Sequence, residues 1–167
     1  MQRAAPGFSL VEILLVVTIL GIVTALALPV FSSTNADRLR SAASVLAADL
    51  DYVRGESIAH PSDTRVIVFD TATERYHIAA ASTSSTPLQN LFTKEDHIVS
   101  FGSGTVSSLI GVTIDSVSVG GDDELGFDAF GAPDQITDAT ITLGCEGATI
   151  VLTVKAGSGE VVVGQIN

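Results

Sequence analysis

A long apolar run near the N-terminus constrains this chain more than any other feature. Residues 8–31 are 24 residues in which the one ionisable side chain is Glu12. As an α-helix this run is about 36 Å long, because each residue rises about 1.5 Å, and that length spans the hydrocarbon core of a bilayer. A carboxylate inside such a run is costly unless a positive group neutralises it. We therefore expect an apolar helix whose acid has a specific partner.

Three interpretations account for the run. A secretory signal peptide needs a shorter apolar core followed by a small-residue cleavage site, and "ALALPV" is a mediocre one. A signal anchor fits the length, with Arg3 holding the N-terminus in the cytoplasm, but it gives no role to Glu12 or to Gly7. In the third interpretation the chain is cut before the run, between Gly7 and Phe8. The new amine of Phe8 then lies one helical turn from Glu12.

The segment "GFSLVEILLVVTILGIVTALALPVF" resembles the N-terminus of type IV pilins and type II secretion pseudopilins. The resemblance implies that a membrane prepilin peptidase cuts after Gly7 and that Phe8 is then N-methylated. It also implies that Glu12 is the acid characteristic of the family, and that Pro29 lies where these proteins commonly have a helix-kinking proline. In a filament, Glu12 would face the positive N-terminus of a neighbouring subunit and set the register of assembly.

Residues 35–60 predict an amphipathic helix that continues the apolar one and ends at Pro61. Its apolar positions step by three and four residues, which places them on one helical face. They are Leu39, Ala43, Leu46, Leu50, Val53 and Ser57. We expect this face to lie on a sheet. Near the end of the helix, we interpret Arg54 and Glu56 as a solvated face or a local ion pair, with subunit contact as the alternative.

From Thr64 the pattern changes to alternation and short β-branched runs, which predicts about eight strands. The expected strands are 64–70, 75–80, 97–101, 112–119, 124–127, 139–143, 149–154 and 160–165. "DTATE" and "KAGSGE" are expected hairpin turns, and residues 81–96 an exposed polar loop. The predicted fold class is α+β, with a long N-terminal α-helix packed on a C-terminal antiparallel β-sheet domain.

Three further segments resemble minor pseudopilins of the GspH/FimT type. "VRGESI" keeps the Arg, Glu and Ile of their Ala-Arg-x-Glu-Ala-Ile pattern. "LGFDAFGAPD" resembles their Phe-x-x-x-Gly element, and "ATITLGCEGATIVLTVKAGSGEVVV" resembles their closing three strands. The resemblance implies four parts, namely a leader 1–7, a membrane and filament-core helix 8–31, its amphipathic continuation 32–60 and a β-rich head 61–167.

The charge of the chain is strongly negative, with 19 acidic against 8 basic residues and a net charge of −11. From Asp96 onward Lys155 is the one basic residue among ten acidic ones. Such a surface repels phosphate backbones and anionic lipid head groups, so we do not expect nucleic acid as a partner. The single cysteine, Cys145, permits no intramolecular disulfide and is expected to be a small buried hydrophobe.

The sequence contains no catalytic cluster that we can identify. Its three histidines, His60, His77 and His97, lack the spacing of metal ligands and are expected to be solvated or core residues. No P-loop, dinucleotide fingerprint or nucleophile elbow is present. We therefore expect a protein without enzymatic activity.

The stretch "GGDDELGFDAFGAPD" is the one candidate metal site. It offers hard oxygen ligands near glycines, as Ca²⁺ prefers, although the spacing does not match an EF-hand loop. The candidate ligands are Asp122, Asp123, Glu124 and Asp128. A solvated acidic turn is the alternative, and no other cofactor is expected.

The resemblance implies a structural minor pilin or pseudopilin that supports protein secretion or filament initiation in a type II secretion pseudopilus or a type IV pilus. Its implied partners are other pilin or pseudopilin subunits, the prepilin peptidase and the inner-membrane assembly platform. Its implied location is a single span of the inner membrane, with the C-terminal domain outside the cytoplasm. The alternative is a FimT-like minor pilin that binds DNA or a surface, although the acidic C-terminus disfavours DNA.

Overall fold

The computed structural model describes residues 9–90 and 93–167, with the side chains of residues 25–34 outside the description. The contacts within the chain divide it into two compact units, with the boundary between Thr34 and Asn35. We call residues 35–167 the head. Helix α1 spans Leu10–Ala59 and therefore contributes residues to both units.

Between Leu10 and Thr24, the side chains of α1 are apolar except for Glu12 and two threonines whose hydroxyls bond to the helix itself. The hydroxyl of Thr18 donates a hydrogen bond to the carbonyl of Leu14 at 2.7 Å. Thr24 makes the same bond to the carbonyl of Leu20, also at 2.7 Å. Both hydroxyls are thereby satisfied without water, which suits a helix with apolar surroundings.

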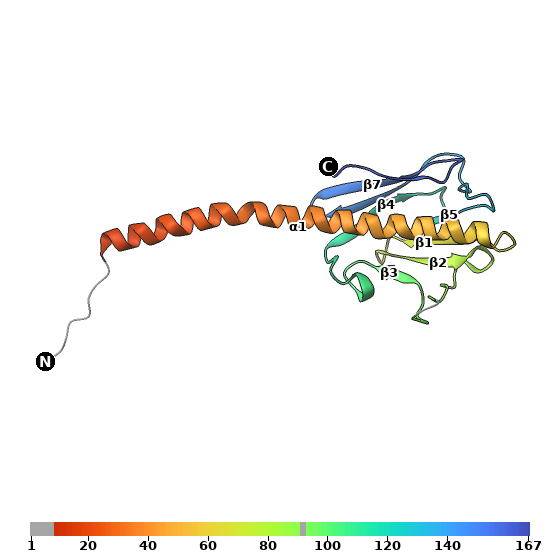
Figure 1. Ribbon diagram of the computed structural model, residues 1–167, viewed down its shortest axis with the longest axis horizontal. Helices are drawn as coiled ribbons and strands as arrows, with labels where there is room; N and C mark the ends of the chain where they lie inside the picture. Colours follow the sequence, from red (N-terminus) through yellow and green to blue (C-terminus); the bar gives the residue numbers. More distant parts are fainter. Residues whose placement is uncertain (1–8, 91–92) are drawn as a thin grey trace. The chain divides into compact units, whose positions relative to one another are not determined.

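In the head, α1 buries one face completely. Seven of its side chains have no exposed surface, and they include all six that the apolar spacing predicts. They are Leu39, Ala42, Ala43, Leu46, Leu50, Val53 and Ser57. This part of the helix lies across strands of both sheets (Figure 1). It ends at Ala59, two residues before Pro61, because a proline disfavours the helical conformation of the residue that precedes it.

Eight antiparallel strands form two four-stranded sheets. In the first sheet the order is β3-β2-β1-β5, formed by β1 (Arg65–Asp70), β2 (Arg75–Ala80), β3 (Ile98–Ser100) and β5 (Glu124–Gly126). In the second the order is β4-β6-β7-β8, formed by β4 (Val112–Ser118), β6 (Ala139–Cys145), β7 (Ala148–Val154) and β8 (Val161–Val163). Two short 3₁₀ turns, η1 (Ala81–Thr83) and η2 (Gly104–Val106), complete the described elements. All eight predicted strands are confirmed, with ends that differ by two residues at most.

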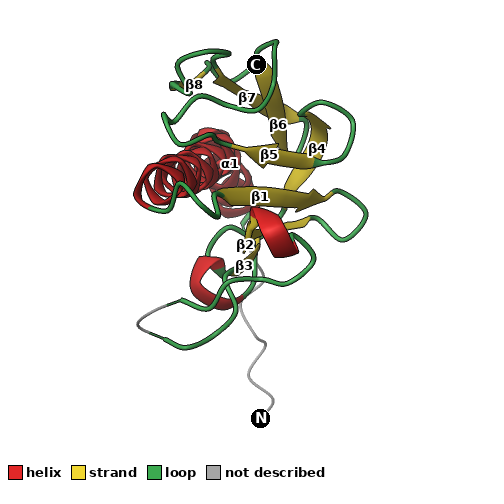
Figure 2. Ribbon diagram, turned by 90° about the vertical axis from the view of Figure 1, so that its right-hand side faces the viewer, coloured by secondary structure: helices red, strands yellow, loops and turns green. Residues whose placement is uncertain are grey.

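Both sheets lie on the same side of α1 and pack against it (Figure 2). The first sheet contributes Ile67 and Tyr76 to the core, and the second contributes Ile141 and Leu152, all without exposed surface. These side chains join the buried face of α1 in one hydrophobic cluster. Cys145 belongs to this cluster as a free thiol, which confirms its predicted burial.

The segment between β2 and β3 corrects one prediction, because it is not simply an exposed polar loop. The amide of Leu88 donates to the carbonyl of Ile78 at 2.7 Å, and the carbonyl of Leu88 accepts from the amide of His97 at 2.7 Å. The side chain of Leu88 packs against the core. The outer edge of β2 extends beyond the short β3, and this segment pairs with the backbone groups that β3 leaves open.

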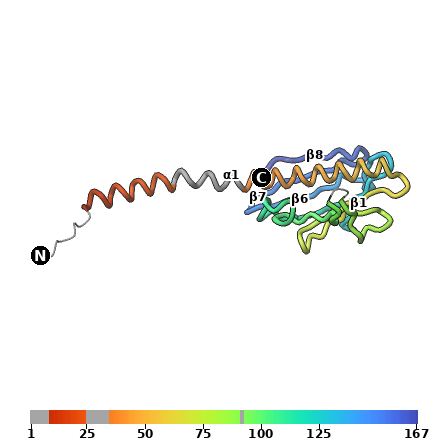
Figure 3. Tube along the Cα trace, turned by 60° about the horizontal axis from the view of Figure 1, so that its bottom comes forward, coloured from red at the N-terminus to blue at the C-terminus, as the bar shows by residue number. Residues whose placement is uncertain are grey.

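The last residues of the chain extend the second sheet beyond β8. Gly164 donates to the carbonyl of Val151 at 2.8 Å, and Asn167 and Thr149 exchange two backbone hydrogen bonds of 3.0 Å. The C-terminus therefore lies along β7, at the end of the head where residue 35 begins the head part of α1 (Figure 3). The opposite end of the head holds the C-terminal end of α1 and the loop that follows β5.

Candidate functional site

The predicted processing residues lie outside the part of the chain that the structure describes. Gly7 and Phe8 precede the first described residue, so cleavage between them and methylation of Phe8 remain predictions. Pro29 falls within residues 25–34, where no side chain is described, and the kink expected there also remains a prediction. Among the predicted N-terminal site residues, Glu12 is the one whose surroundings can be examined.

Glu12 occupies the first turn of α1, where a carboxylate is favourable. Ser9 precedes the helix, and its hydroxyl oxygen accepts a hydrogen bond from the amide of Val11 at 3.3 Å. The carbonyl of Ser9 accepts from the amide of Glu12 at 3.0 Å. A serine followed by glutamate three residues later is the capping-box spacing, and the N-terminus of a helix carries partial positive charge. The capping-box pattern in "SLVE" could have predicted the start of the helix from the sequence.

The side chain of Glu12 is exposed among apolar neighbours. It lines a shallow hollow of about 300 Å³ together with Ile13, Val16 and Val17. Within the described residues no ion pair involves its carboxylate. The large apolar side chains between Leu10 and Val23 are each at least 47 % exposed. No helix within the described ranges meets the length and apolarity needed to cross a bilayer.

Arg54 corrects the interpretation of the end of α1. Its Nε donates a hydrogen bond to the carbonyl of Gly131 at 3.0 Å, 77 residues along the chain. Gly131 has φ +80°, and a Cβ on Gly159 would lie 2.2 Å from the carbonyl oxygen of Gly131. Arg54 is therefore half-buried at a meeting of three segments, the end of α1, the loop after β5 and the turn before β8. A carboxylate oxygen of Glu56 lies 3.4 Å from Nδ1 of His60, one helical turn away.

A polar cluster between α1 and the first sheet was missed by the sequence analysis. Asp49 accepts a hydrogen bond from the hydroxyl of Tyr76 at 2.7 Å, and its other oxygen lies 3.4 Å from Nε2 of His97. The ring of His97 stacks on Tyr52, with centroids 6.0 Å apart. Burial raises the pKa of Tyr76, and the negative charge of Asp49 raises it further. His97 is therefore neither a plain core residue nor a solvated one.

Two of the four predicted calcium ligands form hydrogen bonds within their own loop. Asp128 uses one oxygen to accept the amides of Phe130 and Ala132, both at 2.9 Å, and so caps its own turn. Asp122 accepts the amide of Glu124 at 3.3 Å in the same local manner. In residues 9–90 and 93–167, no three acidic, histidine or cysteine side chains are grouped so that they could hold a metal ion. Asp122 and Asp128 therefore organise the backbone of this loop, and calcium binding by the loop stays a prediction.

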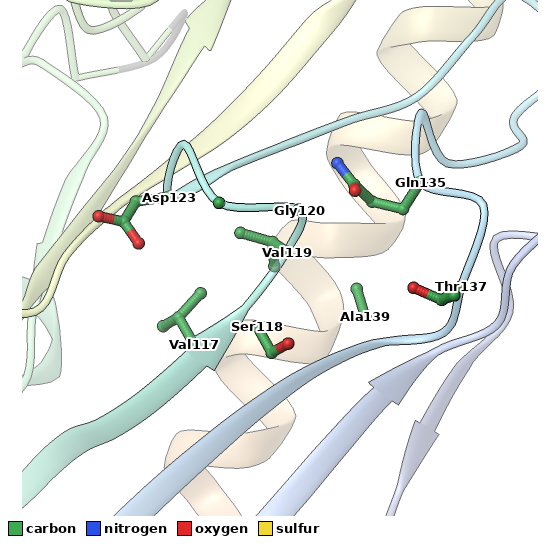
Figure 4. A pocket seen from close by; sticks show the side chains of 9 residues that line it. Val117, Ser118, Val119, Gly120, Asp123, Gln135, Thr137 and Ala139 are labelled. Carbon is green, nitrogen blue, oxygen red and sulfur yellow. The ribbon is translucent and has the colours of Figure 1, made fainter.

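A hollow of about 270 Å³ lies between the end of β4 and the segment that leads into β6 (Figure 4). Its inner surface includes Val119 and Ala139, and the amide of Gln135 lies against the backbone of Gly120. The nine described residues that line it include one carboxylate, that of Asp123, and no basic side chain. These groups can form hydrogen bonds with a ligand but provide no pair of groups for acid–base or nucleophilic catalysis.

Comparison with known proteins adds two findings. Residues 3–28 match the prokaryotic N-terminal methylation motif. The fold matches that of the minor pseudopilin EpsH from the type 2 secretion system of Vibrio cholerae, with a TM-score of 0.54 and 15 % identity over 75 % of this chain and 95 % of that chain. It also matches the type IV minor pilin FimU of Pseudomonas aeruginosa, with a TM-score of 0.53 and 18 % identity over 77 % of this chain and 90 % of that chain.

The chain carries a prepilin-type N-terminus on a minor-pilin fold. A second crystal form of FimU gives a TM-score of 0.52 at 20 % identity. Comparison with curated proteins gives no sequence match. The two named structures are those of a minor pseudopilin and a minor pilin, and their likeness to this chain is one of fold.

The residues described above fall into two separate parts of the sequence. The methylation motif and Glu12 belong to the N-terminal unit, and the head carries the polar cluster, Arg54 and the acidic loop.

Proposed function

We propose that this chain is a minor structural subunit of a type II secretion pseudopilus or a type IV pilus. The observation that carries the proposal is the position of Glu12, an acid in the first turn of an apolar helix, inside a stretch that matches the N-terminal methylation motif. The minor-pilin fold of the head supports the same role. The prepilin peptidase then cuts after Gly7, and Phe8 becomes the methylated first residue.

Processing gives Glu12 a new positive group as a partner. The new amine of Phe8 is four residues before Glu12, which is one helical turn and within reach of a charge pair. In a filament the amine of an adjacent subunit offers the same neutralisation. The exposed apolar side chains from Leu10 to Val23 then pack against those of neighbouring helices, and charge pairing fixes the register in which they do so.

The proposed partners are therefore other pilin or pseudopilin subunits, together with the prepilin peptidase and the inner-membrane assembly platform. Before assembly the chain is held by its N-terminal segment in the inner membrane, with the head outside the cytoplasm. Within the filament, a minor subunit supports initiation or secretion through the contacts that its head makes.

A DNA-binding role gains no support from the head. Lys155, the one basic residue after Asp96 in the sequence, lies 2.7 Å from a carboxylate oxygen of Asp138. The hydrogen bond from Lys155 holds the pKa of Asp138 below its usual range. A lysine paired in this way, in an acidic setting, is poorly placed to bind phosphate.

Two measurements test the proposal in the native host. Mass spectrometry of the mature chain should find a methylated N-terminal Phe8, whereas an intact Met1 or a cut after Ala27 would end the pilin interpretation. Glu12→Ala should enter the membrane as the unchanged chain does but be depleted from sheared filaments. Thr18→Ala is the matched control, a polar position on the same helix, and should assemble normally. Normal assembly of Glu12→Ala would remove the role assigned to Glu12.

A further inference from the structure

The end of the head that holds the C-terminus of α1 displays a large apolar side chain to solvent. Phe130 is 89 % exposed, although aromatic side chains usually lie in the core. Ile58 of α1 is 49 % exposed and adjoins the same turn, since a Cβ on Gly131 would lie 3.0 Å from its Cδ1. We call Phe130 and Ile58 the Phe130 patch.

The turn that carries Phe130 is held rigidly. Asp128 accepts the amides of Phe130 and Ala132 through its side chain, and its own amide donates to the carbonyl of Ala132 at 2.8 Å. Arg54 donates to the carbonyl of Gly131, which lies directly after Phe130. A side chain presented on a fixed turn loses little conformational freedom when it binds, so the turn is organised for contact in advance.

The segment that carries the patch is acidic. Residues 120–138 contain six carboxylates and no lysine, arginine or histidine. The turn before β8 packs on Gly131 through Gly159 and adds the exposed Glu160. Lys155 is paired with Asp138, and Arg54, which bonds to the neutral carbonyl of Gly131, keeps one positive charge beside the patch. Carboxylates therefore outnumber cations in this segment and its contacts.

We propose that the Phe130 patch docks into an apolar pocket on another protein subunit, and that lysine or arginine residues form the rim of that pocket. An exposed aromatic anchor with a polar rim is the anatomy of a protein interface, and opposite charge on the partner gives the contact its specificity. The same carboxylates repel anionic lipid and nucleic acid, which leaves a basic protein surface as the fitting partner. The inference rests on the proposed function, since it assigns one of the head's contacts within the filament system.

The test uses the full chain in its native host. Phe130 is replaced by photoreactive benzoylphenylalanine, cells are irradiated, and the cross-linked peptide is sequenced by mass spectrometry. The matched control carries the same probe at Ile110, which is also exposed, at 63 %. Ile110 differs from Phe130 in its surroundings, because the guanidinium of Arg38 donates a hydrogen bond to the Ile110 carbonyl. Two charge reversals accompany the Phe130 probe, Glu160→Lys beside the patch and Glu146→Lys in the β6–β7 turn.

The expected result is an adduct with the probe at position 130 and none with the probe at position 110. The cross-linked peptide should belong to another protein subunit and contain lysine or arginine beside apolar residues. Glu160→Lys should lower its yield about fivefold, and Glu146→Lys, with the same change in net charge, should not. No adduct, an adduct with lipid or nucleic acid, an adduct with an acidic peptide, or equal effects of the two reversals would overturn the proposal. Phe8 methylation and filament recovery are measured in the same cells. A chain that is methylated and assembled but forms no adduct refutes this inference alone, whereas an unprocessed chain refutes the proposed function.

Discussion

Replacing Ser57 by alanine gives the most informative test of how the head is held together. Ser57 has no exposed surface, and its hydroxyl oxygen accepts the amide of Arg65, the first residue of β1, at 2.9 Å. The same hydroxyl donates to the carbonyl of Val53 at 2.9 Å. The corresponding position of the GspH/FimT pattern is alanine, so the resemblance alone would make Ser57→Ala harmless. The structure predicts that the change is costly.

The expected cost follows from the amide of Arg65. Without the hydroxyl of Ser57 this part-buried N–H loses its acceptor, and the cost approaches the roughly 1–3 kcal/mol of an unsatisfied buried donor. Alanine is a better helix former than serine by about 0.5 kcal/mol, which offsets part of the loss. The net destabilisation of Ser57→Ala is therefore about 0.5–2.5 kcal/mol.

Ser44→Ala provides the matched control. Ser44 is an exposed serine of the same helix whose hydroxyl bonds only to the carbonyl of Arg40, at 2.9 Å. Ser44→Ala gains the higher helix propensity of alanine and leaves no buried donor without an acceptor. The free energy of unfolding of this variant should therefore stay level or rise slightly. Thermal and denaturant unfolding of the full chain in detergent, followed by far-ultraviolet circular dichroism, measures both variants. Equal stabilities of Ser57→Ala and Ser44→Ala would refute the assignment of Ser57 as the acceptor that joins α1 to β1.

Two further changes probe the head by the same unfolding measurement. Gly159→Ala should lower the free energy of unfolding by about 2 kcal/mol or more, because Gly159 has φ +67° and its new Cβ would lie 2.2 Å from the carbonyl oxygen of Gly131. Gly157→Ala, at φ +78° with no atom within 4 Å, should cost only the backbone strain, and an equal cost at both sites would contradict the contact. Tyr76 has a raised pKa, so its contribution to stability is complete below its usual pKa of 10.0 and is lost above it at up to about 1.4 kcal/mol per pH unit. Tyr76→Phe should flatten this alkaline loss between pH 10 and pH 11, and an unchanged slope would show that Tyr76 ionises in the folded head.

The elements of the head could be predicted because burial follows a local pattern. Leu39, Leu46 and Val53 recur at helical spacing, and all three are fully buried against the sheets. The strands can likewise be predicted from the alternation of apolar and polar residues over a few positions. The pairing of Leu88 with Ile78 could not be predicted, because it depends on which strand lies at an edge and how far its neighbour extends.

The features that position the site were harder to predict because they join distant residues. Arg54 looked like a member of a solvated helical face, and its partner Gly131 lies 77 residues away. Asp49 and Tyr76 are 27 residues apart, and no periodicity links them. Asp128 could have been read correctly, since an aspartate before a tight, glycine-containing turn commonly accepts the amides of that turn. The sequence showed the carboxylates but not the local hydrogen bonds that Asp122 and Asp128 accept.

The energetics of the N-terminal unit decide at which step Glu12 acts. Eleven large apolar side chains between Leu10 and Val23 are exposed by 47–80 %. Transferring the exposed part of each into apolar surroundings gains about 1 kcal/mol, or roughly 10 kcal/mol together. A carboxylate within a membrane helix costs only about 2.5–3.5 kcal/mol on insertion scales, and less near the helix end. The apolar gain therefore exceeds the cost of Glu12 several-fold, so removing the carboxylate should leave membrane insertion unchanged. Under the proposed function, the effect of Glu12→Ala therefore arises at assembly, where a lost charge pair is not replaced by any other contact that the described residues offer.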